Sequence, residues 1–77
     1  MSHNTTKIIT AIAIQLLSQH SVKVIEGYKL SVITSYTSEL EDISKKYNLK
    51  MVESFNQQFT VQGIFEVTNS THHTITL

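Results

Sequence analysis

The chain has 77 residues and a formal net charge of zero, because six Lys balance six Asp and Glu, and it contains no Arg, Cys, Pro or Trp. This length predicts one small domain over residues 1–77, and a chain of this size buries only about 60% of its unfolded surface. The composition excludes a disulfide scaffold, a Cys-ligated zinc module and a thiol nucleophile. It also argues against a reader of duplex DNA, which carries a basic patch, usually with Arg.

Residues 5–20 are expected to form an amphipathic helix. Their apolar residues recur at spacings of three, four and seven, which places them near one stripe. The stripe consists of Ile9, Ile12, Ala13, Leu16 and Leu17, widened by Ile8 and Ile14. The density of Ile also fits a buried strand, and periodicity alone leaves both open. The Ala, Gln and Leu content favours the helix, with Asn4 or Thr5 as its cap.

The apolar run from Ile8 to Leu17 is interrupted by Thr10 and Gln15, and it is shorter than the about 20 residues that a membrane-spanning helix needs. One Lys precedes the run, and no small-residue cleavage site stands out, so a secretory signal is not expected. We therefore expect a soluble, cytoplasmic protein with no membrane partner.

Residues 22–26 and 28–35 are expected to form two strands of a hairpin. A three-residue loop over 26–28 pairs Val24 with Leu30 and Val22 with Val32, which makes one face wholly apolar. A two-residue loop would mix apolar and charged residues on each face. The alternation of apolar and polar residues therefore favours the three-residue loop.

A second helix is predicted from Ser38 to about Tyr47. Ser38 and Glu41 match a capping box, in which the first side chain caps the helix and the second reaches back to the backbone. Acidic residues lie in the first turn and lysines in the last, which complements the helix dipole. Asn48 suits the left-handed residue that ends a helix.

Residues 49–55 and 59–67 are expected to form a second hairpin with an odd loop over 56–58. In this register Phe55 pairs with Phe59, Glu53 with Val61 and Met51 with Gly63. Alternation in the polar tail allows a weak final strand over 71–77. The ends, residues 1–4 and 69–77, are expected to be flexible or weakly ordered.

The predicted fold is a two-layer α+β domain in the order α-β-β-α-β-β, with a mostly antiparallel four-stranded sheet packed on two helices. The strand–helix–strand segment from residue 28 to 55 makes its two strands parallel if they share one sheet. No internal repeat or domain boundary is apparent.

The sequence offers little for catalysis or for a bound cofactor. The four His residues are scattered, and adjacent His72 and His73 in a strand would point to opposite faces, so no metal site is expected. The helix dipole accounts for the acidic residues at the start of the second helix. Glu53 is expected on the apolar face without a His or Lys partner, and two glycines are too few for a phosphate-binding loop. We expect no enzyme and no cofactor.

Lys45, Lys46 and Lys50 form the one basic cluster. With aromatic residues nearby, they suggest an alternative function as a small regulator that binds nucleic acid through phosphate contacts and stacking. The absence of Arg weighs against it, because Arg is the residue best suited to bidentate phosphate recognition.

After Lys50 the chain carries no positive charge, and the β-prone strand 59–67 lacks the Lys and Pro residues that protect an exposed sheet edge. We expect the tail, a second copy or a partner to cover it. In the favoured registers, the face opposite the apolar one also carries aliphatic residues. These are Ile25, Ile33, Val52 and Ile64. Three readings stay open: the first helix covers them, they dock on another chain, or they are simply exposed at the surface.

The predicted function is a non-enzymatic protein-interaction module, acting as a homo-oligomer or as an inhibitor or adaptor of a larger complex. In size, lack of motifs and order of elements the chain is similar to small inhibitors carried by phages and plasmids, such as anti-CRISPR proteins, although no shared residue supports this. The partner is a second copy or another protein, bound through main-chain pairing of the edge strand and through side chains. The expected contact residues are Ile25, Ile33, Thr60, Gln62, Ile64 and Glu66.

Overall fold

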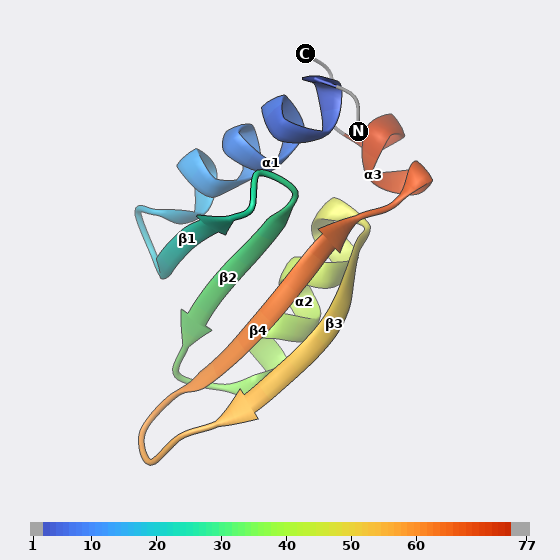
Figure 1. Ribbon diagram of the computed structural model, residues 1–77. Helices are drawn as coiled ribbons and strands as arrows, with labels where there is room; N and C mark the ends of the chain where they lie inside the picture. Colours follow the sequence, from blue (N-terminus) through green and yellow to red (C-terminus); the bar gives the residue numbers. More distant parts are fainter. Residues whose placement is uncertain (1–2, 75–77) are drawn as a thin grey trace.

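The computed structural model describes residues 3–74 (Figure 1). This part of the chain has three helices and four strands, in the order α-β-β-α-β-β-α. They are α1 (His3–Leu16), β1 (Ser21–Ile25), β2 (Lys29–Thr34), α2 (Thr37–Tyr47), β3 (Leu49–Asn56), β4 (Val61–Val67) and α3 (Asn69–Thr74). The structure is a small α+β domain, as the sequence predicts.

The four strands form one open sheet in the order β1-β2-β4-β3, and every neighbouring pair is antiparallel. β2 and β3 are both antiparallel to β4, so they run parallel to each other, as the strand–helix–strand segment predicts. β4 lies between them and is paired on both sides (Figure 1). The prediction that this strand is an exposed edge is therefore wrong, and the edges of the sheet are β1 and β3.

The first hairpin has the predicted register. Val24 pairs with Leu30 and Val22 pairs with Val32. The chain reverses through Glu26 and Gly27, which have φ of 56° and 77°. The turn is closed by the Tyr28 amide, which donates to the carbonyl oxygen of Ile25 at 3.3 Å. A left-handed conformation costs Gly little, and Gly27 meets this need.

The N-cap of α2 lies two residues before the predicted one, Ser38. Tyr36 is the N-cap, and its backbone amide donates to Glu39 Oε1 at 3.1 Å. Glu39 thus has the role predicted for Glu41, and Ser38 lies inside the helix. The C-terminal end is as predicted: Asn48 has a φ of 55°, and its amide donates to the carbonyl oxygen of Ser44.

The register predicted for the second hairpin is wrong. The loop has four residues, 57–60, and it is closed by the Gln57 amide donating to the Thr60 carbonyl oxygen at 2.9 Å and by the Thr60 hydroxyl donating to Gln57 Oε1 at 2.8 Å. This loop pairs Phe55 with Gln62. A shift in the register between Met51 and Glu53 makes Val52 the extra residue of a β-bulge.

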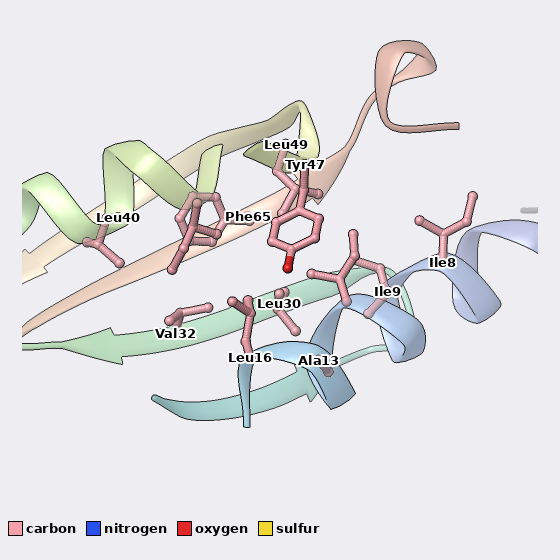
Figure 2. Packing of buried hydrophobic residues seen from close by; sticks show 12 residues of the cluster. Ile8, Ile9, Ala13, Leu16, Leu30, Val32, Leu40, Tyr47, Leu49 and Phe65 are labelled. Carbon is pink, nitrogen blue, oxygen red and sulfur yellow. The ribbon is translucent and has the colours of Figure 1, made fainter. Parts of the chain in front are cut away.

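Helices α1 and α2 bury the apolar face of the sheet in one core. Ile9 and Leu16 of α1 lie with Leu30 of β2, Tyr47 of α2 and Phe65 of β4 in the same cluster (Figure 2). α1 packs mainly against β1, and α2 packs against the other three strands. The two helices also meet through a hydrogen bond, in which the Tyr47 hydroxyl donates to the Gln15 side-chain oxygen at 3.0 Å.

The ends of α1 differ from the prediction. The helix begins at His3, so the expected caps Asn4 and Thr5 lie inside it. It ends at Leu16, and Leu17, which the periodicity places in the buried stripe, is 57% exposed. Ile14 is 65% exposed and does not widen that stripe.

The polar tail forms helix α3 over Asn69–Thr74, so the weak strand expected over 71–77 is absent from the described part of the tail. Residues 75–77 lie outside the described range, as do residues 1–2 of the N-terminal end. The Thr71 side chain is fully buried, and its hydroxyl donates to the Asn48 carbonyl oxygen. The Thr68 amide donates to the same Thr71 hydroxyl at 2.9 Å, so one side chain ties α3 to the end of α2.

Within the described residues, no helix has the length and apolar content needed to cross a membrane.

Gly63 provides a test of the packing between α2 and β4. A Cβ at this position would lie 3.1 Å from the Phe65 ring and 3.2 Å from both methyl carbons of Leu40. Gly63→Ala should lower the free energy of unfolding by about 1–3 kcal/mol, because the Phe65 ring and the Leu40 methyl groups would have to shift within a packed core. Urea unfolding measures the change. The exposed neighbour variant Ser54→Ala is the control and should stay within about 0.5 kcal/mol of the wild type.

The start of α2 provides a second test. Glu39→Ala should lower the free energy of unfolding by about 1 kcal/mol, since the Tyr36 amide loses its acceptor. Glu41→Ala should change it by less than about 0.5 kcal/mol, because Glu41 is exposed and has no capping role. Glu39→Gln keeps an acceptor and should retain most of the stability. Equal effects of Glu39→Ala and Glu41→Ala in urea unfolding would contradict this assignment.

Candidate functional site

The face of the sheet opposite the helices, here called the outer face, is covered by no helix in the described part of the chain. The core cluster joins residues of α1 and α2 with Leu30, Val32 and Phe65, so both helices lie on one side. In Figure 1 α2 lies behind the sheet, and no ribbon crosses in front of β2, β4 and β3. The expectation that the first helix covers the outer face is wrong.

The strand registers arrange the side chains of the outer face in three rows that cross the sheet from β1 to β3. Residues that pair across antiparallel strands share a face, so each row follows from the pairing. The upper row is Ile25, Lys29, Glu66 and Lys50; the middle row is Lys23, Ser31, Ile64 and Glu53; the lower row is Ser21, Ile33, Gln62 and Phe55.

The centre of the outer face is apolar and well packed. Ile64 is only 8% exposed, although no helix covers it. It lies between Ser31 of β2 and the bulge at Val52 of β3, and both of these residues are also at least half-buried. The Gln62 side-chain amide donates to the Ser31 hydroxyl at 2.7 Å and so satisfies the polar groups beside Ile64. The centre therefore lacks an unsatisfied polar group that would oppose its burial.

Charged side chains surround this centre on three sides. Lys29 Nζ lies 4.0 Å from Glu66 Oε1 in the upper row and 5.4 Å from the centre of the Tyr28 ring. Lys23 lies on the edge strand β1 and Glu53 on the edge strand β3, at opposite ends of the middle row, and both are exposed. An apolar centre within a charged border is typical of surfaces that bind proteins.

Most of the predicted contact residues come together on the outer face. Ile25, Ile33, Gln62, Ile64 and Glu66 all lie there. The sixth residue, Thr60, precedes β4 and lies in the loop 57–60. Main-chain pairing with a partner is not available to β4, because both of its edges are occupied.

Two residues of the outer face lie on the side opposite to the one that alternation predicts. Strict alternation predicts both Phe55 and Glu53 on the apolar side, and the observed register places them on the outer face. Phe55 is 45% exposed and supplies the one aromatic ring among the residues of the three rows. The bulge at Val52 causes the change, and alternation along β3 does not reveal it.

The basic cluster is divided by the fold. Lys45 and Lys46 lie in the last turn of α2, on the helix side of the sheet, whereas Lys50 lies on the outer face beside Glu66. Lys46 Nζ lies 5.4 Å from the centre of the Tyr47 ring. The three lysines are therefore divided between α2 and the outer face, and nucleic-acid binding remains a prediction.

A hollow of about 530 Å³ lies where the chain leaves α1 and β2. His20 Nδ1 lies 4.0 Å from Glu39 Oε2 at its wall, and Ile33 and Thr60 border it. No group of three or more His, Asp or Glu side chains in the described residues is placed to hold a metal ion. The lining is mixed, and Glu39 is already used to cap α2.

No family model matches the chain, and neither a curated protein nor a solved structure matches it.

The position of Ile64 outside the core gives a test of this site. Ile64→Ala should lower the free energy of unfolding by about 1–2 kcal/mol, because Ile64 lies outside the cluster that both helices cover. Leu30→Ala removes a fully buried side chain beneath both helices and should cost about 3–5 kcal/mol. Urea unfolding of both variants measures the difference. Equal losses would place Ile64 in the core and remove the centre of the proposed surface.

Proposed function

We propose that this protein is a small, non-enzymatic protein-interaction module that binds its partner through the outer face of its sheet. The observation that carries the proposal is an uncovered four-stranded face with a packed apolar centre at Ile64. An antiparallel sheet often turns one face to water, and a solvated face is polar along its whole length. The outer face instead carries the aliphatic or aromatic side chains Ile25, Ile33, Val52, Phe55 and Ile64.

The pattern of the outer face resembles the general anatomy of a protein interface. Four of its five apolar residues lie in or beside the middle and lower rows and Ile25 lies in the upper row, whereas the charged residues lie in the upper row and at the two ends of the middle row. Such interfaces place aromatic anchors and aliphatic groups inside a polar rim that excludes water. Phe55 is the anchor of this surface, because it combines a large ring with substantial exposure.

The partner in this proposal is a second copy of the chain or a larger complex that the protein inhibits or links. An inhibitor of a host defence complex, carried by a phage or plasmid, is one such role. A rigid sheet face suits this function, since binding then needs little ordering of the module itself.

Photo-crosslinking from the outer face tests the proposal. Phe55→p-benzoylphenylalanine changes an exposed aromatic residue of the outer face into a crosslinker, with little change in shape. Irradiation of cells that naturally produce the protein should yield a discrete crosslinked band, and mass spectrometry identifies the partner. Adding Ile64→Lys to the same chain should remove the band, because a charge enters the apolar centre.

Phe59 provides the matched control for this experiment. It is 80% exposed in the loop 57–60, outside the outer face. Phe59→p-benzoylphenylalanine should give no discrete band. Crosslinking at equal yield from both positions, or from neither, would overturn the proposal. Circular dichroism of the Ile64→Lys chain must show the wild-type spectrum for its loss of the band to count.

A further inference from the structure

We infer that the occupant of the outer face is a second copy of this chain, packed face to face about a two-fold axis that runs parallel to the strands. This inference rests on the proposed function, because it needs the outer face to be a docking surface. The observation that carries it is the arrangement of charge across the upper and middle rows of side chains. The chain has no net charge, so a second copy meets no overall repulsion.

The two-fold axis relates opposite sides of the face to each other. A half-turn about an axis parallel to the strands places β1 over β3 of the second copy and β2 over its β4, with each row facing the same row. Lys23 then faces Glu53 of the other copy, and each pair occurs twice. Lys29 likewise faces Glu66 of the other copy, which extends the ion pair within one chain to a network of four charges.

The apolar and polar residues also match in this arrangement. The central Ile64 faces Ser31 of the other copy, and Ile33 faces its Gln62, so the aliphatic groups of both copies interleave across the centre. Lys50 at the corner faces Ile25, where its aliphatic stem can cover the apolar side chain while its ammonium group stays in water.

The other two-fold axis in the plane of the face, perpendicular to the strands, is disfavoured. It places each strand over itself, with the middle row facing the middle row. Lys23 would then face Lys23 of the other copy, and Glu53 would face Glu53. Like charges placed directly opposite each other destabilise an interface. The charge pattern therefore selects the axis parallel to the strands.

The size of the face agrees with a small dimer interface. Strands of five to eight residues at about 4.8 Å spacing make a face on the order of 19 by 23 Å. Two such faces bury on the order of 1,000 Å² in total, which lies at the lower limit for a specific interface. Dimerisation should therefore depend on concentration, and sheets packed in this way cross at about 30°.

Cysteine crosslinking tests the arrangement directly, because the sequence contains no cysteine of its own that would compete with introduced ones. Positions 23 and 53 lie on the two edge strands, three strand spacings or about 14 Å apart within one chain. A bifunctional thiol reagent with a shorter reach cannot join them within one molecule. In Lys23→Cys/Glu53→Cys it should therefore produce covalent dimers, with peptide mapping showing position 23 linked to position 53.

The single variants are the matched controls. Lys23→Cys alone and Glu53→Cys alone should give no covalent dimer, whereas a mixture of the two should give one. Covalent dimers of either single variant would support the axis perpendicular to the strands and overturn the proposed one. A lack of crosslinking in both the double variant and the mixture would also overturn it.

Charge reversal supplies a second, independent measurement. Lys23→Glu should weaken dimerisation about tenfold in sedimentation, because the carboxylate introduced in each copy faces Glu53 of the other. Adding Glu53→Lys reverses the pair and should restore the wild-type affinity to within about threefold. Lys45→Glu on α2 makes the same change of charge away from the outer face and should have no effect. A perpendicular axis predicts no loss in the single variant.

The two proposals fail in different ways. A protein that stays monomeric at all concentrations but crosslinks from position 55 to a different protein overturns the second copy and keeps the interaction module. Absence of any crosslink from position 55 overturns both. Crosslinking of position 55 to another copy of this chain, together with links between positions 23 and 53, supports both.

Discussion

Burial of one sheet face beneath both helices is the constraint on which the rest of the molecule depends. With 40% hydrophobic residues in a chain of 77, the described residues build one core and place no helix over the second side of the sheet. Phe65 of β4 and Leu40 of α2 show how closely this core is packed, because an added Cβ at Gly63 would lie only 3.1–3.2 Å from their side chains. The outer face is the side of the sheet that this core does not use, so its side chains lie outside the cluster beneath the helices.

The two hairpins show what alternation along a strand can and cannot predict. In the first, only one register makes a wholly apolar face, so the pairing of Val24 with Leu30 can be derived from the sequence. In the second, side-chain and backbone hydrogen bonds between Gln57 and Thr60 set a four-residue loop, and a bulge follows at Val52. Neither the four-residue loop nor the bulge can be recognised from the alternation of apolar and polar residues. Alternation alone therefore places Phe55 on the wrong face of the sheet.

The order of the strands depends on contacts that are distant in sequence, and it reverses the interpretation of β4. The β-prone and nearly uncharged sequence of β4 suggests an exposed edge strand that another segment must cover. In the structure β4 is instead an inner strand, paired with β2 on one side and with β3 on the other. The true edges carry the usual protection. β1 is short and bears Lys23, and β3 bears Lys50, Glu53 and the bulge, all of which discourage pairing with another sheet. Both edge strands therefore carry features that disfavour pairing with another sheet, whereas no helix of the described residues covers the outer face.

The bulge at Val52 connects this protection with the charge pattern of the outer face. On its α2 side it lets Leu49 and Met51 point into the core. On the loop side it turns Glu53 and Phe55 outward, where strict alternation would have directed them to the core. One inserted residue thus protects an edge strand, supplies the aromatic group of the outer face and places an acid at the end of the middle row opposite Lys23. The Lys23–Glu53 contact of the orientation proposed for a second copy therefore depends on this irregularity in the sheet, whereas the Lys29–Glu66 contact does not.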